Sequence, residues 1–245
     1  MAKIKFATII LLWHDRYIEN TCHNSKVDAT MKLGLAKKDD GLHVNMSNVL
    51  IRMAQGLTLP EKRVVSICMA QLDSVKLDST GRYKFRLSAQ DYANQFGITD
   101  ETAYEQLKEV GNKLLHRIAE EVRQTPKGRN VRRWQWVSFA EYQDGEGWIK
   151  LTFNHEMTPH LFMLRKEFTS YKLNQTSALR SIYSWRLFEL LMQFKGTGLL
   201  RITIDDFCHA MEAPASARAN FGELRRRIIE PAAKELIGKN NLLLE

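Results

Sequence analysis

The chain has 245 residues, enough for one large domain or two of ordinary size. Its 44% of hydrophobic and 26% of charged residues are typical of a folded, water-soluble protein and exclude a disordered chain. Because 36 basic residues exceed 28 acidic ones, the net charge of +8 favours a polyanionic partner, nucleic acid first and an anionic membrane surface second. The alternative is a basic surface that only keeps the protein soluble, and the charge alone does not decide between the two.

Residues 1–41 are mixed in composition and end in a turn-like segment at residues 37–41. Their apolar run, residues 4–13, is interrupted by Lys5 and is well short of the ~20 residues that a helix needs to cross a bilayer. A basic start before an apolar run resembles a secretory signal, but no small-x-small cleavage site follows it. We therefore interpret residues 4–13 as a strand or an arm, or as sequence upstream of the first domain.

Regular patterns begin after residue 42. Apolar residues at helical spacing predict a helix over residues 44–53, which Gly56 ends. Pro60 stands at an early helical position, where its missing N–H costs nothing, and the helix that it opens runs to about Asp73. Alternating apolar residues then predict a strand over residues 83–87.

The next two elements predict a helix-turn-helix. Ser88 caps a short helix over residues 89–96, and Gly97 stops it. The small residue Ala93, four positions before Gly97, allows two helices to cross closely. Ile98 and Thr99 then start a longer helix, whose apolar positions step by four, three, four and four residues: Ala103, Leu107, Val110, Leu114 and Ile118.

A β-hairpin follows, which gives the order of a winged helix. Residues 125–130 form a basic turn, residues 131–139 an aromatic-rich strand, residues 144–147 a hairpin loop, and residues 148–153 the returning strand. Trp134 and Trp136 share one face of the first strand, and core packing and subunit contact are the two interpretations of this pair.

The same order of elements then starts again. The pattern predicts a helix over residues 177–194, a strand over 199–204, a short helix over 207–211 capped by Asp205, and a long helix over 216–237. Residues 242–245 are interpreted as the first strand of a second wing that is cut short. We therefore predict an α+β chain of two tandem winged-helix domains, related as a structural repeat, with residues 1–41 as an N-terminal arm, 42–165 as the first domain and 166–245 as the second.

The second long helix is the stronger candidate for reading DNA. On a helical wheel its apolar side holds Phe221, Leu224, Ile228 and Ala232, while Arg226 and Arg227 face away. Arginine forks pair bidentately with guanine edges or phosphates, which suits a helix that enters the major groove. The alternative is a solvated helix face with the pairs Glu223–Arg227 and Arg226–Glu230, and Pro231 should kink the helix near Arg227. The predicted DNA-binding residues of this domain are Arg218, Asn220, Arg225, Arg226 and Arg227.

In the first domain the long helix carries mixed charges and is a weak recognition helix. Its basic turn and the strand after it are the better candidates for phosphate contacts. A protein–protein role, as a dimer contact, competes with DNA binding for this domain. The predicted phosphate-contacting residues are Lys127, Arg129, Arg132 and Arg133.

Motifs of several enzyme classes are absent from the sequence. It has no phosphate-binding Gly-x-x-x-x-Gly-Lys loop, no Gly-x-Ser-x-Gly elbow and no His-Glu-x-x-His helix, and none of its seven histidines are two residues apart. Asp205 and Asp206 are able to bind a metal, but they stand where a helix cap belongs. Cys22, Cys68 and Cys208 lie far apart and are interpreted as buried thiols of a reducing cytosol. We expect no catalytic residue, metal or cofactor.

Residues 168–191 resemble the junction helix of iteron-type plasmid replication initiators. Residues 57–65 resemble the early helix of that family, and residues 221–232 its second recognition helix, so the resemblance covers about residues 43–245. By position, Arg225, Arg226 and Arg227 match the arginine run of the family. Residues 1–41 have no counterpart in it, and the second wing is shorter.

The resemblance implies a bacterial cytoplasmic protein with two winged-helix domains that binds directly repeated double-stranded origin sites (iterons). It also implies a monomer active in initiation, a dimer that represses its own promoter, and as partners a host replication initiator, a helicase and chaperones. Two alternatives stay open at this stage, a dedicated winged-helix transcriptional repressor and a DNA-nicking replication enzyme. Tandem repeats beside the gene would favour initiation, whereas a single inverted repeat would favour a repressor.

Overall fold

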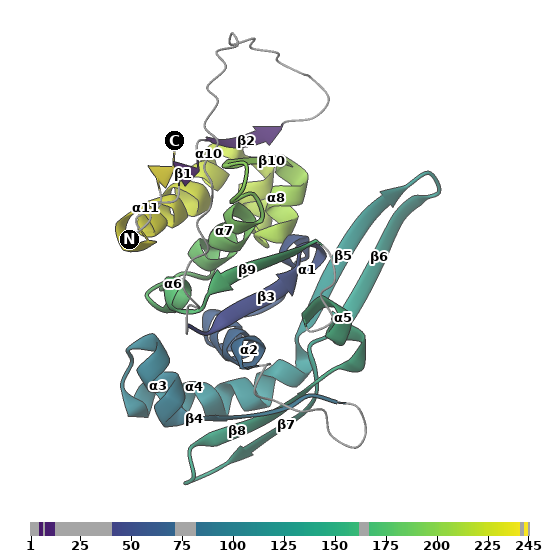
Figure 1. The fold of residues 1–245 in the computed structure, drawn as a ribbon. Coiled ribbons are helices and arrows are strands. Elements are labelled where there is room, and N and C mark those ends of the chain that lie inside the picture. Colours follow the sequence, from purple (N-terminus) through teal and green to yellow (C-terminus); the bar gives the residue numbers. More distant parts are fainter. Residues whose placement is uncertain are drawn as a thin grey trace.

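The structure, a computed structural model, describes residues 5–6, 8–12, 41–71, 82–161, 167–240 and 243–244. Two helical modules are stacked on either side of a short two-stranded sheet, and a long β-hairpin projects from the side of the molecule (Figure 1). The central sheet pairs β3 (His43–Ser47) with β9 (Phe168–Lys172) in antiparallel register. The two winged-helix modules expected from the sequence are present.

The first residues of this sheet correct one prediction. Residues 44–53 do not form one helix but strand β3 followed by the short helix α1 (Asn48–Arg52). Val44 and Met46 are buried at alternate positions of the strand. In so short a segment, the spacing of apolar residues does not distinguish a strand from a helix. The backbone groups of β3 are satisfied by β9, which lies more than 100 residues away in the sequence and leaves no local pattern.

The next helices follow the sequence prediction closely. Helix α2 (Leu59–Ala70) has Pro60 in its first turn, and the Glu61 carboxylate accepts a hydrogen bond from the Thr58 N–H at 2.7 Å. The expected end of this helix at Asp73 lies outside the described residues. Strand β4 (Lys84–Ser88) leads into α3 (Ala89–Phe96) and α4 (Asp100–Lys113), and the turn between them uses Gly97 with φ of 59°.

Helix α4 is shorter than predicted. It ends at Lys113, a 3₁₀ turn (Leu114–His116) follows, and Ile118 begins strand β5 (Ile118–Thr125) instead of ending a helix. Strand β5 pairs with β6 (Gly128–Gln135), and the register places Glu120 opposite Arg133 and Glu121 opposite Arg132. Pairing with β6 makes these residues a strand. The helical spacing of apolar residues continues to Ile118 and therefore extends beyond the true end of the helix.

The wing of the first module is a different hairpin from the one that carries the basic turn. It consists of β7 (Val137–Gln143) and β8 (Trp148–Phe153), which join β4 in the order β4-β8-β7. The predicted strand over residues 131–139 is broken at Trp136, whose buried indole donates a hydrogen bond to the Gln55 carbonyl at 2.7 Å. The hairpin of β5 and β6, called the arm from here on, is therefore an addition to the winged-helix order.

The second module repeats the order with corrected boundaries. The predicted helix over residues 177–194 is divided into α6 (Asn174–Ser177) and α7 (Ile182–Gln193), which Ser181 caps. Strand β10 (Leu199–Thr203) is followed by α8 (Ile204–Ala210), whose cap is Thr203 and not Asp205.

The remaining elements of the first module are a 3₁₀ turn (His155–Met157) and α5 (Thr158–Leu161).

The long helix predicted over residues 216–237 is interrupted twice. Helix α9 (Ala215–Ala219) ends at Asn220, whose backbone is extended, and α10 (Phe221–Leu224) starts there. A π turn η4 (Arg225–Ile229) then leads into α11 (Glu230–Asn240). Pro231 has no N–H to give to the carbonyl of Arg227, so the distortion of the helix expected near that residue is confirmed in the form of a π turn.

Two N-terminal strands join the second module. Strand β2 (Thr8–Leu12) pairs in parallel with β10, and β1 (Lys5–Phe6) pairs in parallel with β11 (Leu243–Leu244). The expectation of a strand near the N-terminus is therefore correct for these residues. In the first module, the strand that pairs with the equivalent β4 is β8, and it runs antiparallel.

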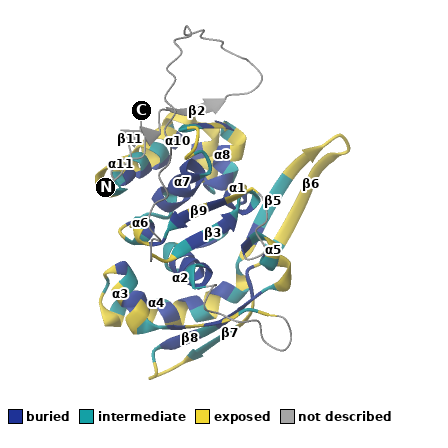
Figure 2. Cartoon of the chain, viewed as in Figure 1, coloured by how far each residue is buried: buried dark blue, intermediate teal, exposed yellow. Residues whose placement is uncertain are grey.

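The two modules share one continuous core. Helix α7 lies at its centre, with Trp185, Leu187 and Phe188 fully buried. Figure 2 shows buried residues along α7, α2 and the central sheet, whereas the outer part of the arm is exposed. Among the described residues, no helix is long and apolar enough to cross a membrane.

Candidate nucleic-acid interface

The three arginines of the second module lie on the π turn and face solvent. The exposed fractions of the Arg225, Arg226 and Arg227 side chains are 65%, 69% and 54%. Behind them, Leu224 and Ile228 are buried in the core and fix the turn to the module. The predicted outward orientation of Arg226 and Arg227 is confirmed, and Arg225 shares it.

Two carboxylates hold these guanidinium groups in place. Arg226 Nη2 lies 2.8 Å from Glu223 Oε1, Arg227 Nη1 lies 3.7 Å from Glu223 Oε2, and Arg225 Nε lies 2.8 Å from Glu230 Oε1. The hydrogen bond from Arg226 and the nearby charges hold the pKa of Glu223 below its usual value. Exposed ion pairs of this kind are worth ~0.2–1 kcal/mol, so a phosphate or a base edge can replace the carboxylate at little cost.

One ion pair differs from the sequence prediction. The pair Glu223–Arg227 is present, but Glu230 pairs with Arg225 and not with Arg226. In the π turn the Glu230 N–H bonds to the carbonyl of Arg225, five residues back, so side chains five positions apart come together.

The other predicted residues of this helix have structural contacts. The Asn220 Oδ1 accepts a hydrogen bond from the Glu223 N–H at 3.3 Å and caps α10. The Arg218 Nε donates to the Ala213 carbonyl at 2.7 Å, which closes the turn before α9. Phe221, expected on the apolar side, is 38% exposed at the start of α10, because the helix begins there and its first residue lies at the rim of the core.

The basic residues of the arm are exposed but do not form one cluster. Arg129 and Arg133 lie on one face, where Arg133 Nε is 2.7 Å and Arg129 Nη2 is 4.0 Å from Glu120. Arg132 lies on the other face, and Lys127 is in the turn at the tip. Within the described residues, neither Lys127 nor Arg132 has an ion-pair partner. The expected hairpin loop at residues 144–147 joins β7 and β8, whereas the basic turn belongs to the separate hairpin of β5 and β6.

The wing formed by β7 and β8 contacts α4. The wing and the adjoining strand β4 carry basic residues that the sequence analysis did not predict as DNA-binding. Lys108 Nζ lies 2.8 Å from Asp144 Oδ1 in the wing loop, and the Tyr104 hydroxyl accepts a hydrogen bond from the Gly145 N–H at 2.8 Å. On the adjoining sheet, Arg86 and Lys150 occupy paired positions of β4 and β8, 4.8 and 4.3 Å from the centre of the Trp148 ring. Cation–π contacts of this type hold a basic pair at the surface. Only the strand register brings these two cations together.

Trp136, which directly follows the arm, belongs to the core, and Trp134 of β6 lies at its edge. Trp136 is fully buried, which confirms core packing for this residue. Trp134 is half-buried and lies against the His160 ring of α5, with ring centres 5.5 Å apart. Burial lowers the pKa of His160. Among the described residues, no cluster of three or more histidines, cysteines or carboxylates is close enough to hold a metal ion.

Comparison with known proteins identifies the family. The family described as "Initiator Replication protein, WH1" matches residues 43–192, and the family described as "Initiator Rep protein, WH2" matches residues 203–245. The chain is an initiator replication protein. The resemblance inferred from residues 57–65, 168–191 and 221–232 is thereby confirmed.

Individual relatives agree with this assignment. The chain is 29% identical to an uncharacterized 27.6 kDa protein of Escherichia coli over 82% of its length and 87% of that protein. It is 25% identical to a replication initiation protein of Escherichia coli over 83% of its length, and spans 64% of that protein. The crystal structure of the Pi initiator protein in complex with iteron DNA has the same fold, with a TM-score of 0.63 at 23% identity, covering 82% of this chain and 88% of the other.

The two family matches divide the chain between α7 and α8. The WH1 match ends at residue 192, within α7, and the WH2 match begins at residue 203, the last residue of β10. The exposed arginines therefore lie in the part of the chain that matches WH2.

Proposed function

We propose that this initiator replication protein starts plasmid replication by binding directly repeated double-stranded sites in the origin, without an enzymatic step of its own. The observation that carries the proposal is the exposed run of Arg225, Arg226 and Arg227 on the π turn η4 of the second module, fixed to the core by Leu224 and Ile228. The Pi initiator protein, which shares the fold, was crystallised with iteron DNA, and this supports the same class of ligand.

The residues divide into two roles. Arg225, Arg226 and Arg227 enter the major groove, where guanidinium forks pair with guanine edges or phosphates. On the first module, the exposed cations of the arm contact phosphates and set the register on the duplex: Lys127, Arg129, Arg132 and Arg133. Arg218 and Asn220 shape the turn that presents the arginines.

Two modules on one chain occupy successive major grooves about 10 bp apart, which gives a site of roughly 20 bp. A DNase footprint on the sequence flanking the gene tests this: we expect tandem protected sites in direct repeat. A single protected inverted repeat would favour a dedicated repressor. Relaxation of a supercoiled origin plasmid by the protein with magnesium would show a nicking enzyme and overturn the non-enzymatic proposal.

We further propose that a dimer formed through the first module represses the promoter of its own gene, while the monomer acts at the origin together with a host initiator, a helicase and chaperones. The basis is the mixed charge of α4, which suits a protein contact better than a groove contact. A promoter–reporter fusion measures the repression, which should rise with protein concentration. Sedimentation should show the dimer at the same concentrations.

A further inference from the structure

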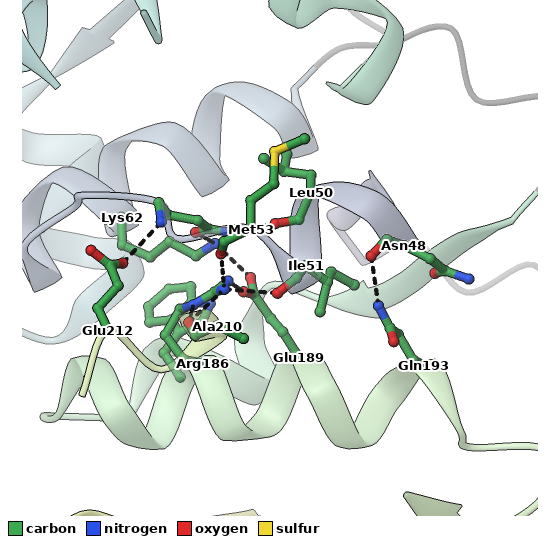
Figure 3. Close-up of polar contacts among 12 residues, drawn as sticks. Asn48, Leu50, Ile51, Met53, Lys62, Arg186, Glu189, Gln193, Ala210 and Glu212 are labelled. Atoms are coloured by element: carbon green, nitrogen blue, oxygen red, sulfur yellow. Dashed lines mark hydrogen bonds and ion pairs between the residues drawn. The ribbon is translucent and has the colours of Figure 1, made fainter. Parts of the chain in front are cut away.

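The two modules are joined by buried and half-buried hydrogen bonds around residues 51–56, which comprise the end of α1 and the start of its connection to α2 (Figure 3). Three side chains contact this segment or its neighbour in the arm: Arg186 of α7, and His209 and Glu212 of the second module. We call these three residues the interdomain clamp.

Arg186 connects both modules through one buried guanidinium group. Its Nη2 donates to the carbonyls of Ile51 and Met53 at 2.7 and 2.8 Å, and its Nε and Nη2 donate to the Ala210 carbonyl at 3.1 and 3.0 Å. Its Nη1 lies 2.8 Å from Glu189, which also pairs with the buried Lys62 at 2.7 Å. A planar group with this many short, directional contacts resists rotation of one module against the other.

Glu212 also contacts the first module directly. Its carboxylate accepts hydrogen bonds from the Gln55 N–H at 2.9 Å and from the Gly56 N–H at 2.9 and 3.1 Å. Glu212 has a left-handed backbone with φ of 51°, a strained conformation for this residue type that turns the carboxylate toward the first module.

The opposite side of this contact is equally constrained. Gly56 has φ of 64°, and a Cβ atom there would lie 2.7 Å from the Ile118 carbonyl at the base of the arm, so only glycine fits. Nearby, the His209 Nε2 lies 3.0 Å from the Glu120 carbonyl of β5. The clamp therefore holds the α1–α2 connection and the arm together.

The clamp is linked to both DNA-facing elements. Its His209 contacts Glu120 in strand β5 of the arm. Glu212 lies in the turn between α8 and α9, which leads into α10 and the arginines. A rotation at the clamp would therefore change the angle and the distance between the arm and η4.

We propose that Glu212 is a positioning residue, supported by Arg186, that fixes how many base pairs separate the two half-sites on DNA. The inference rests on the proposed function, in which both modules contact one duplex. One added base pair rotates the far half-site by about 35° around the helix axis. A rigid connection between the modules allows tight DNA binding at one half-site spacing only. A flexible connection allows binding at several spacings, with a lower affinity for the best of them.

The experiment uses the full chain and a duplex that the wild-type protein selects from a randomised 40-bp pool. Affinity is measured for that duplex and for versions with one or two base pairs inserted between the half-sites. The variants are Glu212→Ala, the conservative Glu212→Gln, and as matched control Glu156→Ala, which removes an exposed carboxylate of the first module. Thermal melting confirms that each variant folds.

For the wild type and Glu156→Ala, two inserted base pairs should weaken binding by at least about 30-fold, and for Glu212→Ala by less than about 5-fold, with Glu212→Gln between them. An unchanged ratio in Glu212→Ala, even with lower affinity for every duplex, would overturn the inference, because it would show a structural role only. If Glu212→Ala does not fold, an unchanged ratio in Glu212→Gln overturns it equally. Failure of the wild type to select any duplex would instead overturn the proposed function.

Discussion

Arg225 and Glu230 lie five residues apart and form an ion pair of 2.8 Å, a spacing that brings side chains together on a π turn and not on an α-helix. The same turn directs Arg226 and Arg227 to solvent, both toward Glu223. Pro231 is the cause, since it removes the N–H that would continue the α-helical ladder. The π turn thus leaves three consecutive arginines exposed to solvent.

Replacing either Arg226 or Arg227 by alanine should weaken binding to the selected duplex by about 1–3 kcal/mol, because each loses a guanidinium contact to a base or phosphate. Competition binding against duplexes with single base changes tests this prediction. Each variant should distinguish the original base pair from its replacements less well than the wild type does, at one position of the site. Arg180→Ala, an exposed arginine before α7, is the control and should bind as the wild type does. Unchanged affinity in both helix variants would remove η4 from the DNA interface.

Replacing Lys127 or Arg132 in the arm should weaken binding by a similar factor for every DNA sequence. Neither side chain has an ion-pair partner in the described part of the chain, so each is available to a phosphate and releases a counterion on binding. The measurement is affinity against salt concentration, where the slope of log K on log salt should fall by about 1 for each variant. A wild-type slope would place the arm away from DNA.

The buried Lys62 should make stability depend on pH. Burial is the main cause that lowers its pKa to about 8, despite the attraction of Glu189. Between about pH 8 and its unfolded value of 10.5, the unfolded chain binds more protons at this residue than the folded one, so the free energy of unfolding rises with pH there.

Urea unfolding of wild type and Lys62→Met at pH 7 and pH 9 measures this effect. The difference between the two proteins cancels the opposing contributions of Cys68 and Tyr171, whose pKa values burial raises. We expect the wild type to gain about 1 kcal/mol over the variant between these values, up to the 1.36 kcal/mol that one pKa unit represents. Parallel curves would contradict the assignment to Lys62.

The sequence predicts best what local physics decides. Pro60 opens α2, Ser88 caps α3, Gly97 ends α3 and Thr99 stands at the start of α4, because each of these groups acts on its own helix end. The outward orientation of Arg226 and Arg227 also follows from the apolar spacing of the second long helix. Such local features are sufficient to place the candidate site on this helix.

Features that depend on distant partners could not be predicted in this way. The apolar series of α4 continues to Ile118, but the strand there is decided by β6, and Ile118 is 47% exposed. Likewise Arg86 and Lys150 meet only through the β4–β8 register, and Glu212 reaches Gly56 across 156 residues. The spacing of apolar residues along the chain does not indicate which distant residues pair.

The N-terminal strands should stabilise the second module. Because β2 pairs along the whole of β10, removing residues 1–12 leaves an edge of β10 without its partner strand. Hydrogen exchange of those β10 amides (Leu199–Thr203) that are protected in the full chain should then accelerate by about tenfold or more, since local opening exposes them. The amides of Phe85 and Leu87 in β4, which pairs with β8 in the first module, serve as the internal control and should keep their protection. Equal protection of β10 in the full and shortened chains would show that residues 5–12 do not form the strand in solution.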